Sequence, residues 1–273
     1  MTYENEAALV VSTGLNPKHL KRELERKGVT APEICVYYET DSTNREARAY
    51  HDMHREGEAV FIADGQTAGR GRRGRSFCSP HGAGIYMSFL LHPKGELRDL
   101  TSVTTYAAVA VCRAIERACG LRTDIKWVND IYYKGKKLGG ILTEGALSED
   151  MKTASYVIVG IGLNLARCDF PDEIAEIATS IEEITGSAPE RNLLLTEIMA
   201  ELLSGLDGIS SDETLEEYRR RSFLVGREIT VHKLTASYPA RVIGIGEDTS
   251  LLIRLTDGSV EKLITGEVSV RER

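Results

Sequence analysis

The stretch Gly69–Arg75 reads GRGRRGR and is the most informative part of this 273-residue chain. No Asp or Glu occurs between Gly65 and Gly95, although acidic residues outnumber basic ones 41 to 34 overall. Arginine supplies planar, permanently charged donors, and glycine lets the backbone come close to a ligand. The segment therefore suits a phosphate-bearing ligand, although most arginine runs are solvated basic loops.

The glycines of this stretch also satisfy the G-x-G-x-x-G spacing of dinucleotide-binding folds. Those folds require a helix to begin at the third glycine, here Gly74, so that the amino end of the helix receives the pyrophosphate. The chain instead continues RSFCSPHGAG, in which Pro80, Gly82 and Gly84 forbid a regular helix. No strand with an acidic ribose ligand follows at the expected distance. The sequence therefore excludes a Rossmann domain.

Composition sets the protein class. Hydrophobic residues make up 42% and charged residues 27%, as in globular proteins, and the length allows one large domain and a small one. A net charge of −7 disfavours broad binding to nucleic acid or an anionic membrane.

The sequence has no long apolar run and no signal pattern at its amino terminus, so we expect a cytoplasmic protein. The five scattered cysteines predict neither a disulfide framework nor a zinc site.

Hydrophobic periodicity predicts an α+β protein with a mixed central sheet and flanking helices. A capping box, Thr43-x-x-Glu46, marks the start of one helix. We expect helices over 17–27, 44–55, 100–119, 192–206 and 213–223, and strands over 34–39, 59–63, 84–91, 124–128, 131–133, 137–144 and 156–165. After Gly226, five short strands (228–233, 240–245, 250–255, 260–264 and 268–270) predict a small β-barrel.

Five segments, taken together and in order, resemble the catalytic domain of the biotin–protein ligases. They are Asp41-Ser-Thr-Asn44, Gln66-Thr-Ala-Gly-Arg-Gly-Arg-Arg-Gly-Arg75, Lys126-Trp-Val-Asn-Asp130, Lys137-Leu-Gly-Gly-Ile-Leu142 and Gly160-Ile-Gly-Leu-Asn164. The resemblance runs from about Ile34 to Arg271, and the arginine loop combined with KWVND and KLGGIL is highly specific. The β-rich tail resembles the small SH3-like carboxy-terminal domain of that family.

The resemblance implies a class II synthetase-like catalytic domain over 33–224 that binds biotin and ATP, and an SH3-like barrel over 225–273. Residues 1–32 form a short lead-in, too short for the roughly three helices of a winged DNA-binding domain, so we expect the form lacking that domain. The implied reaction joins biotin and ATP, with Mg²⁺, into biotinyl-5′-AMP. A lysine of a carboxylase biotin carrier domain then takes the biotin.

The first step of this reaction brings a carboxylate against a triphosphate. Two like charges about 4 Å apart repel by ~1 kcal/mol in water and by about 4 kcal/mol at an effective dielectric of about 20. A partly dehydrated site therefore needs fixed cations, and the sequence supplies four arginines in the loop together with Lys137. No nucleophile–base pair is required, because the protein is not itself modified.

The resemblance also assigns site residues. Biotin-binding residues are Ser42, Thr43, Asn44, Gln66, Gly69, Arg70, Gly71, Arg72, Lys137 and Gly140. ATP-binding residues are Arg72, Arg75, Phe77, Asn129, Asp130, Lys137, Asn164 and Arg167. The catalytic residues are Lys137, which would bridge the biotin carboxylate and the α-phosphoryl oxygen, Arg72, and Asp130, which would orient the incoming amine. The protein has no metal ligand set of its own in this scheme, since ATP carries the Mg²⁺.

Several residues of these motifs also have a purely structural interpretation. Ser42 and Thr43 suit helix capping, Lys137 could be a surface lysine beside Lys136, and Asp130 suits a turn. Trp127 fits core packing as well as the wall of a pocket.

Other functions stay open at this point. A lipoate or other acyl ligase shares the fold and the adenylate chemistry. A biotin sensor or a nucleic-acid binder using the basic loop would be non-catalytic, although the acidic remainder of the chain disfavours nucleic acid. Edge strands allow a homodimer.

Overall fold

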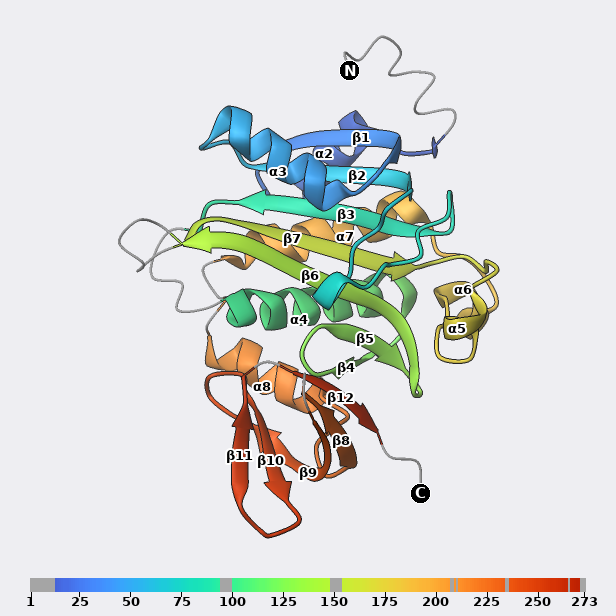
Figure 1. Ribbon diagram of the computed structural model, residues 1–273. Coiled ribbons are helices and arrows are strands. Elements are labelled where there is room, and N and C mark those ends of the chain that lie inside the picture. Colours follow the sequence, from blue (N-terminus) through green and yellow to red (C-terminus); the bar gives the residue numbers. More distant parts are fainter. Residues whose placement is uncertain are drawn as a thin grey trace.

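The centre of the molecule is a seven-stranded sheet with the order β1-β2-β3-β7-β6-β5-β4 (Figure 1). The computed structural model describes residues 13–93, 100–147, 154–206, 209, 211–233, 236–264 and 266–270. Strands β1 (Glu33–Thr40) and β2 (Ala59–Gln66) are parallel, and every other neighbouring pair is antiparallel. The remaining strands are β3 (Gly84–Leu91), β4 (Asp124–Lys126), β5 (Asp130–Tyr133), β6 (Lys136–Leu147) and β7 (Ala154–Asn164). The predicted mixed sheet is confirmed.

Helices cover the two faces of this sheet (Figure 1). One face carries α3 (Thr43–His54), which packs on β2, β3 and β7. The other carries α4 (Leu100–Cys119), which packs on β6 and β7 and contacts α7 (Arg191–Ser204) and α8 (Asp212–Arg221). Helix α2 (Pro17–Arg26) rests on α7 and β1. Because both faces are covered, all eight residues of β3 are buried.

The start of α3 corrects one prediction. No capping box forms at Thr43: the helix begins there, with Ser42 as its N-cap and no hydrogen bond from the Ser42 side chain. The Thr43 N–H and hydroxyl instead donate to Oε1 of Gln66, at 3.0 and 3.2 Å. The Glu46 carboxylate accepts from the Thr40 hydroxyl. A side chain from β2 thus replaces the local cap, which only the tertiary fold could bring there.

The five expected carboxy-terminal strands are confirmed and form a second sheet. It is antiparallel, with the order β11-β10-β9-β8-β12. Its members are β8 (Glu228–His232), β9 (Ser237–Ile245), β10 (Leu251–Leu255), β11 (Val260–Leu263) and β12 (Glu267–Val270). Trp127 Nε1 donates to the Thr249 carbonyl at 3.0 Å, which ties this sheet to the part of the chain that forms the seven-stranded sheet.

Three short helices escaped the sequence analysis: η1 (Arg72–Gly74), α5 (Asp172–Ala175) and α6 (Ile181–Thr185). Helices of three to five residues are too short to show a hydrophobic period. Two predicted segments fall partly outside the described residues: the lead-in up to residue 12, and the end of the family resemblance at Arg271. None of the described helices combines the length and the apolarity needed to cross a bilayer.

A charge clamp, defined as His81 with Glu39, Asp64 and Arg191, fastens the segment that leads from the arginine loop into β3. The two ring nitrogens of His81 lie 3.1 Å from Asp64 Oδ2 and 2.9 Å from Glu39 Oε2. Arg191 on α7 donates to the other oxygen of Asp64. The hydrogen bond to Glu39 and then that to Asp64 raise the pKa of His81, against the opposing effect of partial burial.

The raised pKa of His81 predicts how stability depends on pH. Because the folded pKa lies above the unfolded value of about 6.5, the stabilisation is fully present below that value and is lost as pH rises through the folded pKa. The His81→Gln variant should therefore lose more unfolding free energy at about pH 5.5 than at about pH 9. The loss should stay below about 1 kcal/mol, since the side chain is 37% exposed and water screens it.

Urea denaturation of both proteins at the two pH values measures this difference, with His54→Gln, outside the clamp, as the control. An equal loss at both pH values would contradict the assignment.

Candidate active site

A cavity of about 380 Å³ opens beside the start of α3 and beneath the arginine loop. This volume is in the range of small-ligand sites. The lining includes all the predicted site residues except Gly69 and Arg167. These are Ser42, Thr43, Asn44, Gln66, Arg70, Gly71, Arg72, Arg75, Phe77, Asn129, Asp130, Lys137, Gly140 and Asn164. Segments far apart in the sequence therefore meet at one cavity.

The arginine loop, residues Gly69–Arg75, is a tight hairpin. The Gly71 N–H donates to the Arg75 carbonyl at 2.7 Å, and the Phe77 N–H donates to the Gly69 carbonyl at 2.9 Å. The turn lies at η1, where Arg73 has a φ of 57°. A Cβ on Gly69 would lie 2.4 Å from the Phe77 carbonyl oxygen, so a side chain there would force the hairpin open. Gly69 thus shapes the loop without lining the cavity.

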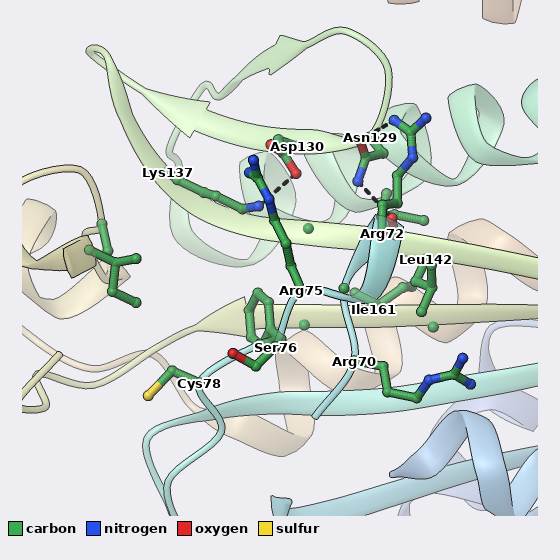
Figure 2. Close-up of a pocket in the computed structure, with 18 of the residues that line it drawn as sticks. Arg70, Arg72, Arg75, Ser76, Cys78, Asn129, Asp130, Lys137, Leu142 and Ile161 are labelled. Carbon is green, nitrogen blue, oxygen red and sulfur yellow. Dashed lines mark hydrogen bonds and ion pairs between the residues drawn. The ribbon is translucent and has the colours of Figure 1, made fainter. Parts of the chain in front are cut away.

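Lys137 and Asp130 form an ion pair in the cavity, with Nζ 2.7 Å from Oδ1 (Figure 2). Both backbone groups of Lys137 are bonded to the segment 177–179: its N–H donates to the Ile177 carbonyl at 2.7 Å, and the Thr179 N–H donates to its carbonyl at 2.9 Å. A Cβ on Gly140 would lie 3.3 Å from the Asp130 carboxylate and 3.4 Å from the lysine nitrogen. Gly140 therefore leaves the space that the pair needs.

Asn129 connects the arginine loop to β6. Its amide nitrogen donates to the Ile141 carbonyl at 2.8 Å, which turns its oxygen toward the loop, where Arg72 Nη1 donates to it at 2.9 Å. In Figure 2, Arg75 also extends from the loop toward the Asp130 end of the cavity. Cationic side chains from the loop and from β6 thus converge on one end of the site.

A second network fixes Asn44 at the opposite end. Asn44 is 5% exposed, and its Oδ1 accepts from the Ser88 hydroxyl at 2.6 Å. Its Nδ2 donates to Glu144 Oε2 at 2.8 Å, and the same oxygen accepts from Arg70 Nη1 at 3.1 Å. A Cβ on Gly160 would lie 2.1 Å from the Asn44 oxygen. The sequence analysis missed Ser88 and Glu144, because isolated polar residues on strands carry no motif.

Gln66 joins the start of α3 to the exit of the loop. Besides accepting from Thr43, it donates through Nε2 to the Ser79 hydroxyl at 2.8 Å. That hydroxyl donates to the Phe77 carbonyl at 3.0 Å. Both ends of the amide are hydrogen-bonded, so the orientation of Gln66 is settled by its partners.

Aromatic side chains form the wall of the cavity. The Phe77 ring packs over Gly162, where a Cβ would lie 2.5 Å from Cε1 of the ring. Trp127 is 4% exposed and also lines the cavity, so core packing and a place in the wall both hold. Burial, and then the charge of Asp130, raise the pKa of the Tyr132 phenol, which keeps it neutral.

Several lining residues were not foreseen. Phe170, Ile174, Ile177 and Ala178 line the cavity from the segment after β7. Their spacing of four, seven and eight residues from Phe170 is helical and was the signal available for finding them. Arg73, expected only as one of the loop cations, also lines the cavity, and further unforeseen contributors are Ser76, Cys78, Lys126, Tyr132, Ile141, Leu142, Gly160, Ile161, Gly162, Gly266, Val268 and Ser269. Burial raises the pKa of the Cys78 thiol.

Of the two residues predicted at the end of and after β7, Asn164 lines the cavity and Arg167 does not. The Asn164 amide reaches the cavity and donates to the Thr179 carbonyl at 3.0 Å. Arg167 is exposed, and its N–H donates to Glu182 Oε2 at 2.8 Å. A role for Arg167 at the nucleotide therefore stays a prediction.

Comparisons with known proteins bear on this geometry. Residues 36–164 match the model of the biotin/lipoate A/B protein ligase family. The bifunctional ligase/repressor BirA of Bacillus subtilis is 30% identical over 248 residues, covering 86% of this chain and 73% of its own length. The biotin–[acetyl-CoA-carboxylase] ligase of Paracoccus denitrificans is 35% identical over 223 residues, covering 79% and 91%.

A solved structure is similar over almost the whole described fold. The biotin protein ligase from Aquifex aeolicus in complex with biotin and ATP superposes with a TM-score of 0.75 at 30% identity, covering 88% of this chain and 99% of the other. Relatives of this identity, matched over most of their own length, show common descent of sequence and fold. This chain is a member of the biotin protein ligase family.

Proposed function

We propose that this protein is a biotin–protein ligase, which activates biotin with ATP and transfers it to a lysine of a carboxylase biotin carrier domain. The observation that carries the proposal is the convergence of Lys137 with the arginine loop over one cavity of about 380 Å³. The ligase names of the relatives support the reaction class, and the Aquifex aeolicus complex supports the two substrates.

The start of α3 would bind the biotin head. Ser42, Thr43 and Asn44 offer buried hydroxyl and amide groups and Gln66 a partly buried amide, the partners that a ureido ring needs once it leaves water. Gln66 accepts a hydrogen bond from Thr43, and Asn44 accepts one from Ser88, so three of the four residues are held in place before a ligand arrives and little ordering would be needed on binding. Gly71 and Arg70 would cover the biotin tail from the loop.

The opposite end of the cavity would bind ATP. Arg72 and Arg75 would contact phosphate oxygens as permanently charged donors, and Phe77 offers a ring face to adenine. Asn129 holds the Arg72 guanidinium in place, and Asn164 would lie near the nucleotide.

Lys137 would act where the two substrates meet. In the first step a biotin carboxylate oxygen attacks the α-phosphorus, the bond to the β-phosphate oxygen breaks, and pyrophosphate leaves. The Lys137 ammonium would bridge the carboxylate and the α-phosphoryl oxygen, where negative charge accumulates. In the second step the neutral carrier amine attacks the biotinyl carbonyl carbon, the bond from that carbon to the phosphate oxygen breaks, and AMP and the amine proton leave. Asp130 would accept a hydrogen bond from that amine and orient it.

The lining suits a magnesium ion that arrives with ATP. Asp130 is the one carboxylate among the described lining residues, and Mg²⁺ binds through one or two carboxylates together with substrate phosphates. Within the described ranges, no group of three or more His, Cys, Asp or Glu side chains could hold a metal ion alone. When bound, the ion would neutralise phosphate charge.

Four broader expectations remain proposals. Residues 33–224 would form the catalytic domain after a lead-in over 1–32. The antiparallel sheet in 225–273 would be an SH3-like barrel, as its five short strands suggest. A cytoplasmic location and a possible homodimer rest on composition and on the edge strands.

The alternative function, a lipoate ligase, shares the fold and the adenylate chemistry. Calorimetry with biotin and with lipoate separates a biotin ligase from a lipoate ligase.

The direct test is incubation of the protein with biotin, Mg-ATP and a lysine-bearing carrier domain, followed by mass spectrometry. We expect the carrier to gain the mass of one biotin, and only when ATP is present. An unmodified carrier, with no biotinyl-5′-AMP formed, would refute the proposed function.

Lys137→Ala should slow biotinyl-5′-AMP formation at least about 100-fold, because it removes charge stabilisation made in the transition state. Stability should change little, since the Lys137 and Asp130 side chains are 32% and 22% exposed and such pairs contribute little. Pyrophosphate release measures the rate, and the exposed neighbour Lys136→Ala is the matched control. Activity like that of the wild type in Lys137→Ala would remove Lys137 from the mechanism.

Two glycine substitutions should separate the two ends of the cavity. Gly160→Ala would push on Asn44 and should raise the KM for biotin between about tenfold and 100-fold. Gly162→Ala would push on Phe77 and should raise the KM for ATP to a similar extent. Gly244→Ala, whose Cβ would meet nothing closer than 3.9 Å, is the strand-glycine control. Equal effects of both variants on both substrates would contradict the assignment of the ends.

A further inference from the structure

Glu144 lies on β6, beyond the residues that line the cavity. Side chains alternate along a strand, so Glu144 shares a sheet face with Gly140 and Leu142, which do line the cavity. Its Oε2 accepts from Asn44 Nδ2 at 2.8 Å and from Arg70 Nη1 at 3.1 Å. One carboxylate oxygen therefore joins the start of α3 to the arginine loop.

The carboxylate determines which way the Asn44 amide faces. An ionised carboxylate only accepts hydrogen bonds, so the NH₂ group of Asn44 must point at Glu144. The amide oxygen then faces the Ser88 hydroxyl, 2.6 Å away. The second N–H and the second lone pair of this amide are not used by Glu144 and Ser88. Glu144 thus sets where a ligand in the cavity would meet a donor and where it would meet an acceptor.

The same carboxylate also directs Arg70. A hydrogen bond between two charged groups is stronger than a neutral one. The Glu144 side chain is 23% exposed and that of Arg70 is 47% exposed, so water screens part of this ion pair, and the bond acts mainly by orienting Arg70. In Figure 2, Arg70 points away from Arg72, whose partner Asn129 lies at the Lys137 end. Arg70 is therefore drawn to the α3 end of the cavity.

We propose that Glu144 is a positioning residue for biotin. By holding Asn44 and Arg70 on one oxygen, it orients the donor pattern of the biotin pocket and keeps the arginine loop over it. The inference rests on the proposed function, since it assigns Asn44 and Arg70 to biotin. Glu144 acts through these two side chains and does not touch the substrate.

The first test replaces only the charge. Glu144→Gln keeps the size and one acceptor, and it should weaken biotin binding about tenfold by calorimetry, or ~1.4 kcal/mol. The KM for ATP should stay within about twofold of the wild-type value, because the ATP end has its own partners. The thermal unfolding midpoint should stay close to that of the wild type, which separates positioning from a general loss of stability.

The second test measures coupling. Asn44→Ala and Arg70→Ala are each combined with Glu144→Gln, and each double variant should lose less biotin affinity than the sum of its single variants. Glu261→Gln is the matched control, because Glu261 is also partly buried and pairs with Lys233 at 2.6 Å outside the cavity lining. It should bind biotin as the wild type does.

Failure of the Glu144 role and failure of the biotin ligase function would give different results. Wild-type protein that binds biotin and forms the adenylate, with Glu144→Gln binding biotin equally well, would overturn the inference and leave the function standing. Fully additive losses in both double variants would overturn it as well. Wild-type protein that binds no biotin and forms no adenylate would refute the proposed function itself, before any variant is compared.

Discussion

Several positively charged side chains lie around one cavity and repel one another. The fold must hold them close together in spite of this repulsion. Carboxylate and amide oxygens offset it: Asp130 pairs with Lys137, and the Asn129 oxygen accepts from Arg72. Glu144 holds Arg70 in the same way. All three partners come from β5, β6 or the turn before β5, so the rigid sheet holds the cations apart. A polyanionic substrate would enter a site whose charges are already placed.

The cavity exists because the strands beneath it lack side chains at the required positions. Gly140 leaves room for the ion pair, Gly160 for the Asn44 amide, and Gly162 for the Phe77 ring. Two of these glycines lie on β7, which is hydrogen-bonded to β3 on one side and β6 on the other. The centre of the sheet, where strands are paired on both sides, is thus also the floor of the site.

The second sheet also contributes residues to the cavity. Gly266, Val268 and Ser269 reach the cavity from β12 and the residues before it. Trp127 bridges the two parts, since its ring lines the cavity and its Nε1 donates to the carbonyl of Thr249. A change in the carboxy-terminal sheet can therefore act on the site through packing.

By itself, the sequence determined the α+β class and the strands of both sheets, and its motifs pointed to part of the cavity lining. These features could be predicted because strand periodicity and local motifs depend on residues that are close together in the sequence. It misassigned the start of α3, where a capping box was expected, and it did not reveal Glu144, Ser88 or the contribution of β12. Those features depend on strand order and on contacts between residues far apart in the chain. Only the tertiary structure decides such contacts, since an isolated glutamate on a strand looks the same whether it faces water or holds an arginine.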